Sequence, residues 1–91
     1  MRVRWTPAAV DDLEEISNYL KTHHPRYWQP TIRKLYEQIR SLREWPNSGR
    51  LGRESGTREV VLSPLPYIAV YRVKDDRIEI LRIRHAARNV S

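Results

Sequence analysis

The spacing of the apolar residues changes from a helical period to a strand period about half-way along the chain. Between residues 7 and 45, apolar side chains recur every three or four positions, which is the repeat of one helix face. Between residues 57 and 84 come three strand-like runs: the first is rich in β-branched residues, and in those at 67–73 and 77–84 successive residues alternate between two faces, which is the repeat of a strand. Helices followed by a run of strands predict an α+β fold with the helices on one face of a sheet.

The first helical segment has a well-defined start. Thr6 is a favoured N-cap residue, and Pro7 suits the first helical position. One apolar stripe follows, formed by Val10, Leu13, Ile16 and Leu20. Four carboxylates in the same segment are typical of solvated groups that complement the helix dipole: Asp11, Asp12, Glu14 and Glu15. We expect a helix from Pro7 to about Thr22, closed by the run His23-His24-Pro25.

The second helical segment has the more regular stripe and one interruption. The stripe runs through Trp28, Ile32, Leu35, Ile39, Leu42 and Trp45. Pro30 lies inside it, lacks a backbone N–H and clashes with the preceding turn of a helix. The helix therefore either begins near Pro30, after a separate turn over residues 25–28, or is kinked there; we expect the late start. Trp45-Pro46 should end the helix, because the residue before a proline avoids the helical region.

Strand-like patterns flank the helices. One segment precedes them and three follow the loop at residues 47–56: Val3–Trp5, Thr57–Ser63, Tyr67–Val73 and Arg77–Arg84. The short links between the last three favour an antiparallel meander. The predicted order is β-α-α-β-β-β, with a helical hairpin packed on one antiparallel sheet in a single domain over residues 1–91.

The charge of the chain favours an anionic partner. Of 17 basic residues, 14 are Arg and three are Lys, and the formal net charge is +6. The planar guanidinium grips phosphate or carboxylate with two hydrogen bonds, which suits nucleic acid or an acidic protein. An Arg-rich composition can equally reflect a GC-rich genome. The absence of cysteine excludes disulfides and thiol catalysis, and no leader or apolar span is visible, so we expect a cytoplasmic protein.

Motifs for metal or nucleotide chemistry are weak. His23, His24 and His85 do not have the spacing of zinc ligands. The loop NSGRLGRESG contains three glycines but lacks the Lys-Ser/Thr ending of a phosphate-binding loop, and it precedes a strand instead of a helix. We therefore expect no metal site and no cofactor.

A set of Arg, Tyr and His residues on the predicted strands is the remaining candidate site. Its members are Arg58, Tyr67, Tyr71, Arg82, Arg84, His85 and Arg88. Such a set can bind and cleave RNA without metal, with His or Tyr moving protons and Arg stabilising the phosphorane charge. The alternative is that the tyrosines are core residues and the arginines are solvated. Alternation along the last strand predicts Arg82 and Arg84 on one side, and Leu81, Ile83 and His85 on the other.

Five stretches in this order resemble the ParE branch of the RelE/ParE toxins of bacterial type II toxin–antitoxin systems: VRWTPAAVDDLEEISNYL, LREWPNSGR, GTREVVL, PYIAVYRV and IEILRIRHAAR. They cover the chain from Val3 to Arg88. The resemblance implies two antiparallel helices on an antiparallel sheet. It also implies a toxin that inhibits DNA gyrase by binding, needs no catalytic residue, and is neutralised by a ParD-like antitoxin.

The resemblance leads to two sets of candidate contacts. For the target we assign the basic residues of the last strand and the HAAR ending: Arg82, Arg84, His85 and Arg88. For the antitoxin we assign apolar positions of the helical hairpin with two strand residues: Leu13, Ile16, Leu20, Trp28, Arg58 and Tyr71. An acidic, partly extended antitoxin segment would complement an Arg-rich toxin.

Two other interpretations stay open. The first is a RelE-like, ribosome-dependent mRNA endonuclease that uses Arg58, His85 and Arg88. Against it, Val60 and Ile68 stand where such nucleases tend to have basic residues, and no Tyr follows the last Arg. The second is a chain that keeps the fold and the antitoxin pairing but has lost toxicity.

Overall fold

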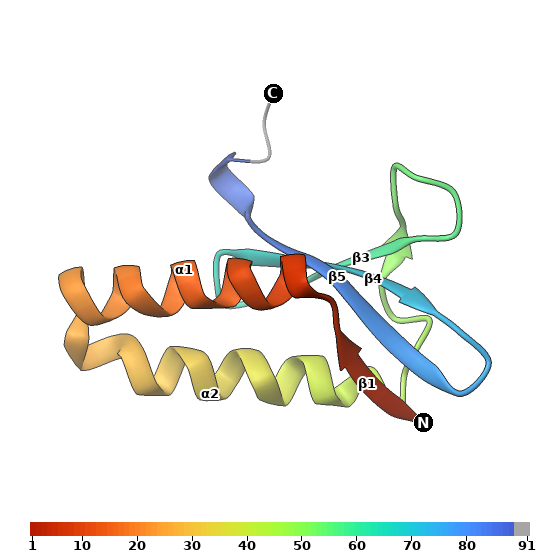
Figure 1. Cartoon of the computed structure of the whole chain (residues 1–91), viewed down its shortest axis with the longest axis horizontal. Helices are drawn as coiled ribbons and strands as arrows, with labels where there is room; N and C mark the ends of the chain where they lie inside the picture. The colour runs from red at the N-terminus through yellow and green to blue at the C-terminus, as the bar shows by residue number, and fades with distance from the viewer. Residues whose placement is uncertain (89–91) are drawn as a thin grey trace.

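In the part of the chain that the computed structural model describes, residues 1–88 without the side chain of Arg88, five strands form one sheet and two long helices cover one face of it (Figure 1). The strands are β1 (Arg2–Trp5), β2 (Arg50–Leu51), β3 (Arg58–Val61), β4 (Tyr67–Val73) and β5 (Arg77–His85). The helices are α1 (Pro7–His23), α2 (Pro25–Ser41) and the short 3-10 helix η1 (Ala86–Arg88). The predicted α+β class is confirmed.

The sheet is mixed, whereas the sequence predicted a wholly antiparallel one. The strand order is β1-β5-β4-β3-β2, and β3, β4 and β5 form the expected antiparallel meander. In contrast, β1 is parallel to β5, with Val3 beside Ile78. The chain between them contains both long helices and three strands, which is ample length for a parallel pair. The short strand β2 lies inside the segment predicted as a loop and pairs with the start of β3.

Thr6 fixes both the start of α1 and its position on the sheet. Its hydroxyl accepts a hydrogen bond from the Ala9 amide at 3.2 Å, and Pro7 occupies the first turn, as predicted. The same hydroxyl lies 3.1 Å from the Ile80 and Leu81 carbonyl oxygens, to which it can donate. The cap therefore also joins α1 to β5, next to the point where β1 ends.

The predicted late start of the second helix is wrong. α2 begins at Pro25 and continues through Pro30. The amide missing at Pro30 would have bonded to the carbonyl of Arg26, which lies in an exposed turn where water can replace it. The indole of Trp28 donates a hydrogen bond to the Ser17 hydroxyl at 2.8 Å, which holds this first part of α2 against α1.

The predicted end of the second helix is also wrong. α2 stops at Ser41, and residues 42–44 form a turn. Trp45 was placed on the buried stripe by its spacing, but because the helix has ended its side chain is 67% exposed.

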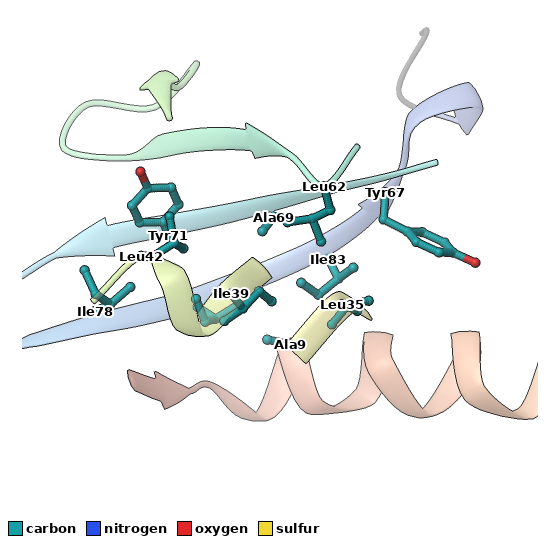
Figure 2. Close-up of a cluster of buried hydrophobic side chains, with 11 residues drawn as sticks. Ala9, Leu35, Ile39, Leu42, Leu62, Tyr67, Ala69, Tyr71, Ile78 and Ile83 are labelled. Atoms are coloured by element: carbon teal, nitrogen blue, oxygen red, sulfur yellow. The ribbon is translucent and has the colours of Figure 1, made fainter. Parts of the chain in front are cut away.

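The core lies between α2 and the inner face of the sheet (Figure 2). Its members are Ala9 of α1, Leu35 and Ile39 of α2, Leu42, Leu62, and the sheet residues Tyr67, Ala69, Tyr71, Ile78, Ile80 and Ile83. On α1, Ala9 is buried while Val10 is exposed. The prediction that Val10 belongs to the buried stripe of this helix is therefore wrong. None of the helices in residues 1–88 is long and apolar enough to cross a membrane.

A bulge in β5 changes the phase of the last strand. Ile80 pairs with Tyr71, but the next pair is Arg82 with Val70, so Leu81 is an extra residue. Without the bulge, the two arginines would follow the core isoleucines on the inner face. With it, Ile83 stays in the core while Arg82 is exposed and Arg84 is half-buried, and the predicted uninterrupted alternation is broken at Leu81.

Candidate functional site

An open groove with a volume of about 610 Å³ runs between α1 and the C-terminal end of β5. We call it the β5 groove. Its apolar lining residues include Ile16 and Ile83. Three aromatic rings, those of Tyr19, Tyr67 and His85, also line it. The charged lining residues are of both signs: Asp12, Glu15, Arg82 and Arg84. Three of the four residues predicted to bind the target therefore lie together at one surface.

Asp12 holds Arg82 at the rim of the β5 groove. The Arg82 guanidinium donates two hydrogen bonds to the carboxylate, at 2.8 and 3.1 Å. These hydrogen bonds, and then the charge of Asp12, raise the pKa of Arg82 above its ordinary value. The carboxylate also accepts a hydrogen bond from the Ile83 amide at 2.9 Å. The interpretation of Asp12 as a merely solvated helix acid is wrong, since its side chain is only 13% exposed.

Asp12 replaces a missing strand neighbour. β1 pairs with β5 as far as Ile80, and beyond that point no strand within residues 1–88 pairs with β5 on this side. The amide of Ile83 would be left without a partner if the α1 carboxylate did not reach it. Sequence spacing gave no signal of this contact, because the two residues are 71 positions apart.

His85 caps the turn that follows β5. Its Nδ1 accepts a hydrogen bond from the Ala87 amide at 3.1 Å, so the proton of the neutral ring is on Nε2. The ring packs edge-on against Tyr67, with centroids 5.5 Å apart. The Ala86 amide donates to the Pro66 carbonyl at 2.8 Å, which further holds η1. One imidazole nitrogen is thus engaged within the chain, and only Nε2 remains for a partner.

The other two residues predicted to bind the target are Arg84, near the end of β5, and Arg88, at the end of η1. Arg84 is half-buried and lies opposite Ile68 in the sheet. Arg88 closes η1, and its side chain lies outside the part of the chain that the structure describes.

The prediction that Tyr71 contacts an antitoxin is wrong. The residue is 0% exposed. Its hydroxyl donates to the Pro46 carbonyl at 2.7 Å and accepts from the Gly49 amide at 2.9 Å. A Cβ at Gly49 would approach the Glu59 carbonyl and this hydroxyl at 2.8 Å, so a glycine is required there. Tyr71 therefore anchors the long loop instead of binding a partner.

The remaining residues assigned to the antitoxin are largely turned inward. Leu20 is buried, and Leu13 and Ile16 pack against the core. Trp28 is half-buried against α1. The Arg58 guanidinium donates to the Gly49 carbonyl at 2.8 Å. Antitoxin contacts at these five residues stay predictions.

The residues assigned to the nuclease alternative are not gathered at one point. Arg58 pairs with Tyr71 near one end of β4, and His85 pairs with Tyr67 at the other end. Four residues of extended strand span roughly 13 Å. Among the described residues, no three His, Asp or Glu side chains gather in a way that could hold a metal ion.

The comparison with known proteins decides the family. A family model described as "ParE toxin of type II toxin-antitoxin system, parDE" matches residues 3–90. The chain belongs to the ParE toxin family. It is accordingly the toxin component of a type II toxin–antitoxin system.

Individual relatives agree with this assignment. Toxin RelE2 of Caulobacter vibrioides is 40% identical over 87 residues, covering 96% of this chain and 97% of that protein. Y4kP of Sinorhizobium fredii is also 40% identical, over 85 residues that cover 93% of this chain and 88% of that protein. A chain of the chromosomal ParDE TA system from P. aeruginosa superposes with a TM-score of 0.84 at 30% identity, covering 93% of this chain and 95% of that one.

Proposed function

We propose that this toxin inhibits DNA gyrase by binding it and that a ParD-like antitoxin neutralises it, with both events in the cytoplasm. The description of the family supports a parDE-type module, and the solved ParDE relative supports an antitoxin partner. Gyrase is the expectation drawn from the resemblance of the GTRE strand start and the HAAR ending to ParE sequences.

The arrangement of the β5 groove is the observation that carries the proposal. Arg82, Arg84 and His85 lie at one surface, where the bulge and the Asp12 carboxylate fix the direction of Arg82. A fixed guanidinium loses little side-chain entropy when it binds, which favours recognition of a protein surface. The η1 turn, capped by His85, continues this surface toward Arg88.

The alternative is a ribosome-dependent mRNA endonuclease, which the name of the RelE2 relative favours. That reaction would need Arg58, His85 and Arg88 around one phosphate. The separation of Arg58 from His85 along β4 and the internal hydrogen bond of each side chain argue against it. If the chain were such a nuclease, Arg88→Ala should slow cleavage about 100-fold or more.

A supercoiling assay tests the proposal. Toxin freed of antitoxin, and checked for folding by circular dichroism, is titrated into a reaction with purified gyrase. We expect inhibition that added antitoxin reverses, and no cleavage of mRNA on programmed ribosomes. Arg84→Glu should weaken inhibition by about tenfold, while Arg26→Glu, at an exposed α2 position that does not line the groove, should not. Ribosome-dependent cleavage by a toxin that leaves gyrase active would contradict the proposal.

A further inference from the structure

The net charge of the chain lies outside its helical layer. Residues 7–45, which contain both long helices, include six basic and six acidic residues. The remaining segments, which form the sheet and its loops, include 11 basic and five acidic residues and so carry the whole formal charge of +6. Figure 1 shows both long helices on one side of the sheet. We call the opposite side the outer face, and it is there that an anionic ligand would meet the excess positive charge.

Arg4 of β1 and Arg72 of β4 project from the outer face. The residues on either side of each arginine pack in or against the core, so alternation turns the arginines the other way. In the sheet register both arginines lie opposite Glu79, because β5 runs between β1 and β4. Neighbouring strands lie about 4.8 Å apart, so the two arginines leave the sheet roughly 10 Å from each other.

Within residues 1–88, neither of these arginines has a partner. Arg4 and Arg72 take part in no ion pair and no side-chain hydrogen bond there. The Glu79 carboxylate between them accepts a hydrogen bond from the Arg77 guanidinium at 3.3 Å instead. The Nε atom of Arg72 is buried and lacks an acceptor in the described part of the chain. An acceptor from a bound ligand would satisfy it, and a phosphate oxygen bonds strongly to a guanidinium.

Further cations lie beside this pair of arginines. Arg2 of β1 is opposite Arg77 of β5, one step along the outer face, and both guanidinium groups share the exposed carboxylate of Asp76, at 3.5 and 3.2 Å. Exposed pairs of this kind contribute little stability, so a multivalent anion can replace them. This end of the sheet, with the turn between β4 and β5, has five basic and three acidic residues: Arg2, Arg4, Arg72, Lys74 and Arg77; Asp75, Asp76 and Glu79.

We propose that the outer face binds the phosphate backbone of duplex DNA, with Arg4 and Arg72 as its central contacts. The five strands of the sheet span roughly 19 Å, over which one strand of DNA carries about five phosphates. The DNA contact is a property of this chain alone. Its use, which is to hold the toxin on the DNA that gyrase binds, rests on the proposed function.

The residues of the outer face favour a duplex over other anionic ligands. Ile68 and Val70, the apolar residues at its centre, are buried, so a protein partner would find no exposed apolar anchor there. Single-stranded RNA is held largely by aromatic rings on which its bases stack. The two tyrosines of β4 belong to the core and not to this face. Guanidinium groups suit the phosphates of a duplex, whose recognition requires neither apolar anchors nor rings.

Fluorescence anisotropy of a labelled duplex, titrated with antitoxin-free toxin over a range of salt concentrations, tests the proposal. The logarithm of the binding constant should fall linearly with the logarithm of the salt concentration. Arg4→Gln/Arg72→Gln should weaken binding about 20-fold at low salt and make this slope shallower by about 2. The matched control is Arg26→Gln/Arg33→Gln, which removes the same charge from exposed positions of α2; it should change binding less than about threefold.

A single variant guards against a loss of folding at the half-buried Arg72. Arg4→Gln, at an exposed position, should weaken binding about fivefold and make the slope shallower by about 1, and circular dichroism establishes that every variant is folded. Equal losses in the double variant and its control would overturn the proposal, because net charge alone would then account for binding. Tighter binding of single-stranded RNA than of the duplex would also overturn it.

The same titrations separate this inference from the proposed target. A toxin that binds the duplex as predicted but leaves gyrase active would contradict only the proposed target. A toxin that inhibits gyrase but does not bind the duplex would contradict only the DNA contact. A loss of antitoxin binding in Arg4→Gln as large as its loss of DNA binding would assign the outer face to an acidic protein and overturn the proposal.

Discussion

The β5 groove and a smaller groove where β1 meets the C-terminal half of α2, the β1 groove, each contain two arginines beside aromatic and aliphatic side chains, but the first carries charges of both signs and the second carries positive charge. The β5 groove has two arginines and two carboxylates, and one of those arginines is fixed by a double hydrogen bond to Asp12. The β1 groove has two arginines and no carboxylate; its lining residues are Val3, Trp5, Tyr36, Ile39, Arg40 and Arg43. The difference shows that the number of arginines in the chain does not determine what a surface can bind. What determines it is whether an acidic residue from a neighbouring element reaches them.

The contrast originates at the end of β1. Up to Ile80, β5 has β1 as its neighbour, and from that point Thr6, the N-cap of α1, and Asp12 of α1 bond to the backbone of β5. The carboxylate that completes the sheet is also the one that neutralises Arg82. On the other side of β1, no strand in the described part of the chain pairs with it, so there its outer edge and the adjoining arginines stay open. We therefore expect the two grooves to serve different partners, the acidic antitoxin at the β1 groove and the target at the β5 groove.

Removing residues 85–91 should give the largest effect on function. The truncated toxin loses His85 and the C-terminal segment, so we expect gyrase inhibition to fall beyond about 100-fold. Antitoxin binding should be unchanged within about threefold, because the β1 groove is untouched. Both quantities are measured on the same preparation, by a supercoiling assay and by calorimetric titration. Full inhibition by the truncated chain would place the target contacts elsewhere.

Asp12→Ala should give the largest effect on stability. It leaves the Ile83 amide without its partner and removes both hydrogen bonds to Arg82, so the free energy of unfolding should fall by about 2–3 kcal/mol. It also makes the β5 groove more cationic and thus more like the β1 groove. The matched control is the neighbouring, exposed Asp11→Ala, for which urea denaturation should show a change below about 0.5 kcal/mol. Equal changes in the free energy of unfolding for the two variants would contradict the structural role assigned to Asp12.

Two substitutions of His85 should separate its capping role from a contact through Nε2. In His85→Asn the amide oxygen can take the place of Nδ1 and keep accepting from Ala87, whereas the longer side chain of His85→Gln takes the place of Nε2. Loss of a cap costs about 1 kcal/mol, so the Ala87 amide should exchange about fivefold faster in the Gln variant than in the Asn variant. The Asn variant, which keeps the cap, should therefore inhibit gyrase more strongly than the Gln variant. Inhibition retained only by the Gln variant would instead indicate a direct contact through Nε2.

The smallest effect is expected at the exposed pair between Arg2 and Asp76. Its atoms lie 3.5 Å apart and the two side chains are 78% and 62% exposed, in contrast to the sheltered Asp12. Arg2→Ala should change the free energy of unfolding by less than about 0.5 kcal/mol. Thermal unfolding of this variant beside Asp12→Ala compares, in one protein, a solvated ion pair with one whose carboxylate is sheltered. A loss as large as that of Asp12→Ala would contradict this distinction.

The sequence predicted those parts of the fold that depend on local chemistry. Thr6 and Pro7 predicted the start of α1, because an N-cap and a first-turn proline act within a few residues. Alternation predicted the meander of β3, β4 and β5 for the same reason. Pro30 led to a wrong helix start, because the cost of a missing amide depends on whether the freed carbonyl is exposed, and only the folded chain determines that.

The features that create the site depend on contacts between distant residues. The parallel pairing of β1 and the bulge at Leu81 both follow from how the helical layer and the sheet fit together. Arg82, Arg84 and His85 were identified from their residue types, but the partner that positions Arg82 was not, because Asp12 resembles any other acidic residue near a helix start. Tyr71 was assigned to the surface, although its hydroxyl is used inside the molecule to hold the loop through Gly49.

The most direct test of separate grooves is one supercoiling titration with the Arg40→Glu/Arg43→Glu toxin, first alone and then with increasing antitoxin. The variant should inhibit gyrase as strongly as the unmodified chain, and antitoxin at the concentration that restores supercoiling with the unmodified chain should fail to restore it. Restoration at the same antitoxin concentration, or a variant that no longer inhibits gyrase, would contradict the assignment of the two grooves to different partners.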